Sequence, residues 1–166
     1  MFSSALMAVV LAVLPVQTGT LTFTRPAAWA DRAPASSMRL AEFVVPRASG
    51  DAEDGELIVY YFGGTGGTVE ANLQRWTSQF QSSKEPTRTT STVNNLRLTS
   101  LDVSGTYVAE VRPGSTERHN KPGFRMRATV VETPKGPYFI KLTGPAATID
   151  QAGAAFEQFL KSLAFK

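Results

Sequence analysis

The segment from residue 56 to residue 80 constrains the fold of this chain more than any other. A nearly continuous apolar and aromatic run covers residues 56–62, four glycines follow between residues 63 and 67, and a helical pattern begins at Val69. Continuous apolar character is typical of a central strand that is covered on both faces, and glycine permits the positive φ angles of a tight turn. The segment therefore predicts a buried strand that passes directly into a helix lying across a sheet.

The glycine-rich loop looks like a phosphate-binding motif but lacks the necessary residues. A Walker loop ends in Gly-Lys-Ser/Thr because the lysine reaches the phosphates, whereas this loop ends in Gly67-Thr68-Val69. A dinucleotide fingerprint needs Gly-x-Gly-x-x-Gly inside a βαβ unit, and the glycine spacing here is different. A structural turn is therefore the favoured interpretation. An anion bound at the free amides of the helix start stays the alternative.

Two amphipathic helices are predicted. The first runs from about residue 69 to residue 82 and begins after Thr68, which is a suitable N-cap. Its apolar face, at helical spacing, consists of Val69, Leu73, Trp76 and Phe80. The second begins at Thr148, which forms a capping box with Gln151, and continues as an apolar stripe to residue 163.

Alternating apolar and polar residues predict strands elsewhere in the chain. They are expected at residues 20–24, 38–45, 96–101, 105–111, 124–131 and 137–143. The threonine-rich stretch 84–95 is predicted to be a loop, or a loop with one edge strand, and residues 112–123 a long polar loop. This element order predicts one α+β domain over residues 19–166, with a twisted, mainly antiparallel sheet packed between helices.

Composition limits the classes of function. With 42% hydrophobic and 19% charged residues, the chain has the composition of an ordinary globular protein. The absence of cysteine excludes disulfides, thiolate metal sites and a cysteine nucleophile. The net charge of +3 is a mild excess without a block of basic residues, so nucleic-acid binding is not expected. We expect a monomer without a cofactor and without a metal ion.

The first eighteen residues have the pattern of a secretory signal peptide. Ala5 to Leu14 form an unbroken apolar run, followed by Pro15 and by small or polar residues to Gly19. This run is too short to span a bilayer, which needs about twenty residues. No Lys or Arg precedes it and the cleavage site is poor, so a short buried helix stays an alternative. We expect residues 1–18 to be a signal peptide and the domain to be exported, periplasmic or extracellular.

Four residues are candidate binding residues, namely Thr68, Asn72, Arg75 and Trp29. Asn72 is a mediocre helix former at the border of the apolar face. Either it hydrogen-bonds the backbone of the neighbouring loop, or it faces a groove together with Arg75. Thr68 stands where the alternative anion site would form. Trp29 is expected to plug the open edge of the sheet, with ligand stacking as the alternative.

His119 and the acidic cluster at residues 51–54 are the other groups with potential chemistry. His119 is the only histidine, and a catalytic triad or a metal site would need partners that the sequence does not place beside it. The acidic cluster lacks the Asp-x-Asp-x-Asp-Gly order of a calcium loop. Solvated surface is the favoured interpretation for both, and no catalytic residue is predicted.

Several segments, taken in order, carry a resemblance to a known family. They are Leu21-Thr22-Phe23 with Pro26 and Trp29, residues 38–43 with Pro46, the apolar strand that enters the glycines, residues 69–76, and residues 137–145. Over residues 20–165 the chain resembles a group of exported, uncharacterised bacterial proteins. The most specific matches are residues 72–76 (Asn-Leu-Gln-Arg-Trp) and residues 139–144. The pattern is similar to the PsbP-like fold.

This resemblance implies a binding protein rather than an enzyme. The PsbP-like fold also occurs in extrinsic subunits of photosystem II and in a Ran-binding nuclear import factor, although a fold by itself is a weak guide to function. We predict a non-catalytic exported binding or accessory domain for an unknown protein or small ligand. Its surface would be the sheet edge, the 112–123 loop or the cleft beside the first helix. The alternatives are a hydrolase or other small-molecule enzyme with a loop-built site, and a weak binder of anionic polymers or membrane surfaces.

Overall fold

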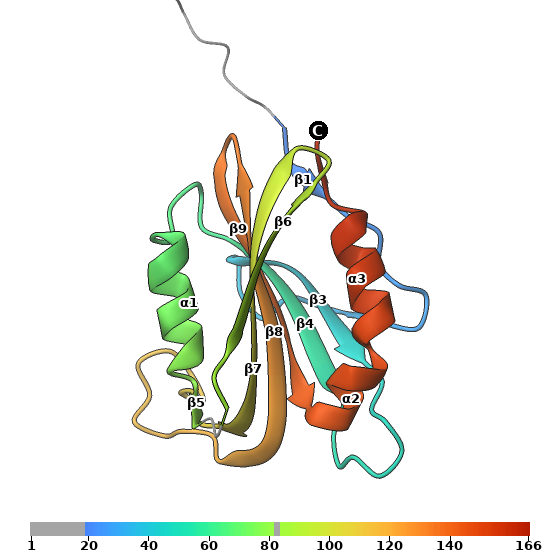
Figure 1. Cartoon of the computed structure of the whole chain (residues 1–166), viewed down its shortest axis with the longest axis vertical. Coiled ribbons are helices and arrows are strands. Elements are labelled where there is room, and N and C mark those ends of the chain that lie inside the picture. The colour runs from blue at the N-terminus through green and yellow to red at the C-terminus, as the bar shows by residue number, and fades with distance from the viewer. Residues whose placement is uncertain (1–18, 82–83) are drawn as a thin grey trace, which may run out of the picture.

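The computed structural model describes residues 19–81 and 84–166. A twisted antiparallel sheet of eight strands has helix α1 (Val69–Thr77) on one face and helices α2 (Ala146–Gln151) and α3 (Gly153–Lys161) on the other (Figure 1). This arrangement confirms the predicted α+β fold. The predicted signal peptide lies outside the described residues.

The strands of the large sheet are ordered β2-β3-β4-β9-β8-β7-β5, and β6 pairs with the same edge of β7. Their bounds are β2 Ala30–Arg32, β3 Arg39–Val45, β4 Gly55–Tyr61, β5 Phe80–Gln81, β6 Thr87–Val93, β7 Leu96–Tyr107, β8 Lys121–Thr133 and β9 Gly136–Pro145. A separate two-stranded sheet joins β1 (Leu21–Thr22) to β10 (Ala164–Phe165), so the two ends of the domain lie side by side. Within the described ranges, no helix has the length and apolarity needed to cross a membrane.

Each face of the sheet has its own hydrophobic core because side chains alternate along a strand. The core under α1 contains Leu73, Trp76, Phe80, Leu101, Val103, Phe124, Met126, Ala128, Val130 and Phe139. The core under α2 and α3 includes Phe43, Leu57, Ile140, Leu142, Ile149, Phe156 and Phe159. Full burial of one such large side chain contributes about 1.5–3 kcal/mol to folding. The two cores therefore hold the helices on opposite sides of one sheet.

The first helix begins as predicted but ends earlier. Thr68 is its N-cap, and the threonine hydroxyl accepts a hydrogen bond from the backbone N–H of Ala71 at 3.1 Å. The helix ends at Thr77 rather than near residue 82. Phe80, predicted on the helical face, instead lies in β5 and pairs with Tyr107 of β7. The apolar spacing of Phe80 serves the same core, but from a strand.

The glycine-rich loop needs its glycines for structural reasons. Gly63, Gly64, Gly66 and Gly67 have φ values of 67°, 90°, 117° and 83°, which other residues rarely adopt. A Cβ atom at Gly66 would also lie 2.7 Å from the ring of Phe139. These conformations explain the loop as the tight passage from β4 to α1.

Several strand predictions need correction. Residues 96–107 form one strand rather than two, because Ser104 and Gly105 continue the pairing with β8. The stretch 84–95 contains the edge strand β6, which was one of the two predicted outcomes. Strands β2 and β10 are short and were missed, because each depends on a partner far along the chain.

The predicted capping box at Thr148 is wrong. Thr148 lies inside α2, whose N-cap is Pro145, and the chain forms two helices around Ala152 rather than one. The backbone N–H and the hydroxyl of Thr148 both donate to Oδ2 of Asp51, at 2.9 Å and 2.5 Å. The local sequence allowed a cap, but a carboxylate from the loop between β3 and β4 became the partner of this threonine.

Candidate functional site

The α1 side of the sheet is covered over only part of its width. Helix α1 packs chiefly on β7 and β8, while α2 and α3 lie on the opposite face (Figure 1). We call the remaining surface, over β3, β4 and β9, the open face. It carries Arg39, Glu42, Glu56, Tyr60 and Lys141, with Arg32 of β2 at its edge.

One row of directly paired residues shows the change across this side of the sheet. From β7 to β3 the row contains Leu101, Ala128, Lys141, Ile58 and Glu42. Leu101 and Ala128 belong to the core under α1. The row contains charged side chains at Lys141 and Glu42. The side chains on this face therefore change from apolar to charged where α1 no longer covers the sheet.

Glu42 is a buried carboxylate at the β3 end of this row, and its side chain is only 2% exposed. It accepts hydrogen bonds from the backbone N–H of Ala35 at 2.9 Å, from Arg32 Nε at 3.0 Å and from Arg39 Nη1 at 2.7 Å. Burial raises the pKa of Glu42, but these hydrogen bonds outweigh it and hold the pKa below its usual value. Glu42 is therefore an ionised anchor for two arginines.

Glu56 completes the neutralisation of these arginines. Its Oε2 atom lies 2.5 Å from Nη2 of Arg32, which thereby bridges Glu42 and Glu56. The guanidinium of Arg39 lies 5.8 Å from the ring centroid of Tyr60, within the range of a cation–π contact. Arg32 and Arg39 are thus both satisfied within the open face.

Lys141 lies in the centre of the sheet and has a different environment. Its ammonium donates to Oε1 of Gln79 at 2.9 Å. Burial, together with the charges of Arg75 and Arg39, lowers the pKa of Lys141 to about 8, and the charge of Glu56 partly opposes these effects. Within residues 19–81 and 84–166, no carboxylate oxygen lies within 4.0 Å of this ammonium. Lys141 is a half-buried cation held by a neutral amide.

Asn72 links the glycine-rich loop to Arg75. Its amide nitrogen donates to the carbonyl oxygens of Gly66 at 2.8 Å and Thr68 at 2.9 Å. Its amide oxygen is thereby left to accept a hydrogen bond from Arg75 Nη2 at 2.6 Å. Arg75 is exposed and, like Lys141, has no carboxylate at ion-pair distance in the described part of the chain. The first interpretation of Asn72, a hydrogen bond to the backbone of the loop, is confirmed. A groove that Asn72 faces together with Arg75 stays a prediction.

The four predicted binding residues are divided between the two faces of the sheet. Thr68, Asn72 and Arg75 lie together on α1 at the border of the open face. Trp29 belongs to the other core, where it is 2% exposed and packs near Phe43. Its indole therefore does not reach the surface beside α1. Ligand binding by any of these residues stays a prediction.

Sequence reasoning missed Lys141, together with Gln79, Glu56 and Tyr60. One signal for Lys141 was present, because it is the only charged residue in the apolar run of residues 138–142. A lysine at the centre of a buried strand is unusual and is normally paired. Nothing local indicated Gln79, which meets Lys141 only because α1 ends above β9.

A hollow of about 380 Å³ lies at the far end of the open face. Its lining includes Glu56, Tyr107, His119 and Lys121. The ring of His119 stacks on Tyr107 with centroids 5.3 Å apart, and Nζ of Lys121 lies 2.5 Å from Oε1 of Glu53. Burial, with the nearby charge of Glu56, raises the pKa of Tyr107 to about 12. Among the described residues, no group of three or more His, Asp or Glu side chains is placed to hold a metal ion.

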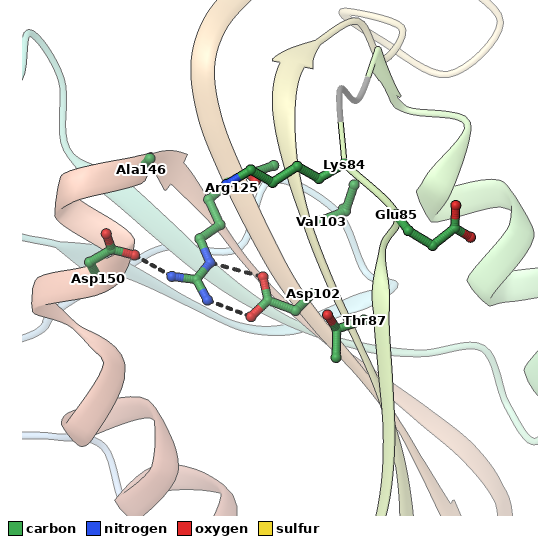
Figure 2. Close-up of a pocket in the computed structure, with 9 residues that line it drawn as sticks. Lys84, Glu85, Thr87, Asp102, Val103, Arg125, Ala146 and Asp150 are labelled. Atoms are coloured by element: carbon green, nitrogen blue, oxygen red, sulfur yellow. Dashed lines mark hydrogen bonds and ion pairs between the residues drawn. The ribbon is translucent and has the colours of Figure 1, made fainter.

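A second hollow, of about 350 Å³, lies on the opposite side of the sheet and is occupied by ion pairs (Figure 2). Arg125 points between Asp102 and Asp150, and its Nε and Nη2 atoms lie 2.9 Å and 2.5 Å from the two oxygens of Asp102. The hydrogen bonds that Arg125 donates to Asp102 and Asp150 raise its pKa above the usual value. This closed cluster ties α2 to β7 and β8, which is a structural role.

Comparisons with known proteins identify the fold. No family model matches this chain, and no curated protein matches it. The crystal structure of PA94 from Pseudomonas aeruginosa, a protein of unknown function, aligns with a TM-score of 0.55 and 17% identity, covering 88% of this chain and 97% of that one. The solution structure of CyanoP, the PsbP protein of Synechocystis sp. PCC 6803, aligns with a TM-score of 0.51 and 13% identity, covering 94% and 97%. These likenesses confirm a PsbP-like fold, whereas membership of the exported bacterial group stays a prediction.

Proposed function

We propose that this protein is a non-catalytic binding domain whose ligand surface is the open face beside α1. The observation that supports this proposal is the pair of cations Arg75 and Lys141, which are held by the amides of Asn72 and Gln79 instead of by carboxylates. For the half-buried Lys141, a charge without a counter-charge opposes folding. Such groups are typical of sites that recognise a ligand.

The hydrogen-bonded groups of the open face favour binding over catalysis. A small-molecule hydrolase would need a nucleophile beside a general base. In the described part of the open face, the side-chain hydrogen bonds instead join arginines to carboxylates and cations to amides. His119 stacks on Tyr107. This arrangement is better suited to holding a charged partner than to breaking a bond.

The charge distribution also argues against a general binder of anionic polymers or membranes. Such surfaces carry clustered positive charge. Here Glu42 and Glu56 neutralise Arg32 and Arg39, so only two cations on the open face are without a carboxylate partner in the described residues. This pattern favours a defined ligand over an extended polyanion.

Affinity capture tests the proposed surface. The full chain is immobilised and exposed to the extracytoplasmic fraction of its host, and bound molecules are identified by mass spectrometry. The comparison uses wild type, the double variant Arg75→Gln/Lys141→Gln and the matched control Arg97→Gln/Lys161→Gln, which removes two exposed charges elsewhere. We expect a molecule that wild type and control retain and the first double variant loses. Equal capture by both double variants would place the binding surface elsewhere.

Export is part of the same proposal and has its own test. The apolar run over residues 5–14 and the PsbP-like fold support it. We expect protein isolated from its host to lack the first eighteen residues and to occur in the extracytoplasmic fraction. Intact mass spectrometry measures the N-terminus, and a chain that starts at Met1 in the cytoplasmic fraction would contradict export.

A further inference from the structure

The open face has an excess of positive charge that can be assigned to two residues. Apart from the hollow at its far end, and with Arg75 at its border included, its charged side chains are the cations Arg32, Arg39, Arg75 and Lys141 and the anions Glu42 and Glu56. This set has two more positive than negative charges. Arg32 and Arg39 are bound to the two carboxylates. The excess therefore belongs to Arg75 and Lys141.

Contacts between the end of α1 and β9 bring these two cations to the same part of the sheet. Gln79, which holds Lys141, follows Arg75 by four residues. Trp76, next to Arg75, packs on Phe139 of β9 with ring centroids 6.3 Å apart. Among the neighbouring charges, Arg75 has the largest effect on the pKa of Lys141, and it acts in the lowering direction. Like charges at a partly buried site oppose folding, because each disfavours the charged form of the other. An anion placed against both would remove this repulsion.

Both cations are oriented rather than free to move. The amide nitrogen of Asn72 is bound to two backbone carbonyls, so its oxygen must face Arg75. Gln79 holds the ammonium of Lys141 through its side-chain oxygen. A guanidinium has five N–H donors and an ammonium three, and the two amides accept only one hydrogen bond from each cation. The remaining donors could bind an oxyanion, for which guanidinium is well suited.

The surroundings indicate which oxyanion fits. Lys141 and Tyr60 lie on the central strands β9 and β4, whose backbone N–H groups are used in the ladder. Side chains alone must therefore provide the hydrogen-bond donors. Phosphate sites commonly also use backbone N–H groups, so this surface is better suited to a carboxylate. Tyr60 is half-buried and lies diagonally beside Lys141 on the same face of the sheet, because Ile58, two residues earlier, pairs with Lys141.

We propose that Arg75 and Lys141 together bind the carboxylate of a small organic acid, whose apolar part lies against Tyr60. This assignment rests on the proposed function, since it names the ligand class of the same open face. Removal of either cation should weaken binding, because the remaining cation contacts the carboxylate from one side only and with a single charge.

Nuclear magnetic resonance titration of the ¹⁵N-labelled full chain tests this assignment. The probes are benzoate, its neutral isostere benzamide and inorganic phosphate, added at constant ionic strength because exposed charges are screened by salt. The proteins are wild type, Arg75→Gln, Lys141→Gln and the control Arg97→Gln. We expect benzoate to shift the amide signals of Tyr60, Arg75 and Lys141 saturably, with affinity lowered about tenfold or more in the first two variants and unchanged in the control.

The other outcomes each overturn a stated part of the proposal. Equal shifts with benzamide, or equal affinity in all four proteins, would show that the two cations do not bind the carboxylate. Saturable binding of phosphate, with no binding of benzoate, would show that the ligand class is a phosphate and not a carboxylate. If no probe binds while affinity capture still depends on Arg75 and Lys141, the proposed ligand class is wrong but the open face is still the binding surface. If affinity capture is also independent of these residues, both proposals are wrong.

Folding of the variants does not limit this test. Arg75 is exposed on α1, so Arg75→Gln leaves both hydrophobic cores intact. If Lys141→Gln loses its dispersed spectrum, Lys141→Met supplies a second variant of similar length without a polar head. A normal benzoate affinity in folded Arg75→Gln is alone sufficient to contradict the proposed pair.

Discussion

The ammonium nitrogen of Lys141 in β9 lies 2.9 Å from the side-chain carbonyl oxygen of Gln79, two residues after the end of α1. This contact joins the centre of the sheet to the carbonyl end of a helix, which carries a partial negative charge and favours a nearby cation. Lys141 is thus tolerated at a partly buried position without a carboxylate beside it. Most of the predictions that follow concern the residues that surround this contact.

The stability of the protein should rise with pH through the titration of Lys141. The folded-state pKa is about 8, below the ordinary value of 10.5. Between these values the unfolded chain binds more protons, so the free energy of unfolding increases as pH rises. We expect wild type to gain stability between about pH 7.5 and 9.5, whereas Lys141→Met gains less. Urea denaturation at both pH values measures this.

Other groups do not obscure this comparison. The charges that act on Lys141 belong to Arg75, Glu56 and Arg39, and carboxyl and guanidinium groups ordinarily titrate well outside this pH range. Tyr60 and Tyr107 have raised pKa values and act with the opposite sign, but only at still higher pH. An identical pH dependence in wild type and Lys141→Met would contradict the prediction.

Asn72→Ala should destabilise the domain and loosen Arg75. The substitution leaves the carbonyl oxygen of Gly66 without its side-chain donor and removes the acceptor of Arg75. The carbonyl oxygen of Thr68 loses one of its two donors and keeps the backbone N–H of residue 72. Loss of a partner for a buried polar group costs about 1–3 kcal/mol. Thermal and urea denaturation measure the change, with Gln74→Ala on the exposed side of α1 as the control. A stability equal to that of the control would mean that Asn72 is not needed for the start of α1.

Gly66→Ala should be among the most damaging single substitutions in the loop. Gly66 has a φ of 117°, and an added Cβ atom would lie 2.7 Å from the ring of Phe139. Backbone strain costs about 1–2 kcal/mol, and overpacking adds about 1–3 kcal/mol. Gly63→Ala is the matched control, because its φ is also positive but no atom lies within 4 Å of the added Cβ. Equal losses of stability in the two variants would show that contact with Phe139 does not matter.

Glu42→Gln should weaken the β2–β3 edge and make the free energy of unfolding less dependent on pH in the acidic range. Glu42 binds Arg32, Arg39 and the backbone of Ala35, and its folded pKa lies below the ordinary 4.5. Its contribution is therefore present above about pH 4.5 and is lost as pH falls through the folded pKa. We expect a loss of about 1–3 kcal/mol at neutral pH, measured by urea denaturation from neutral to acidic pH.

The control for this variant is Glu70→Gln, which removes an equally charged but exposed partner of Arg88. Exposed ion pairs contribute little because solvent screens them, so no measurable loss is expected. If Glu42→Gln behaves like this control, the buried carboxylate does not stabilise the sheet edge.

The elements predicted correctly are those whose signals are local. The apolar run into Gly63 identified β4, the helical spacing from Val69 identified α1, and Thr68 was recognised as its N-cap. The errors occurred where a distant partner decided the conformation. Phe80 left the helix to pair with Tyr107, and Thr148 turned to Asp51 instead of capping a helix.

The candidate site divides in the same way. Asn72 and Arg75 were identified from the sequence because an asparagine flanking an apolar helical stripe is a local anomaly. Lys141 was not, because its neighbours Gln79 and Glu56 come from other elements. Trp29 was a candidate because an aromatic side chain at the edge of the sheet could stack on a ligand, but it packs in the opposite core.

Periodicity, glycine conformation and capping act over a few residues, so the strand–glycine–helix unit, the α+β class and the two polar residues at the border of α1 could be inferred from the sequence. The part of the sheet that α1 leaves open, and the charges that meet there, depend on the tertiary structure. Strand order and register arise from pairing between segments far apart in the chain, and the row from Leu101 to Glu42 exists only after those strands have assembled.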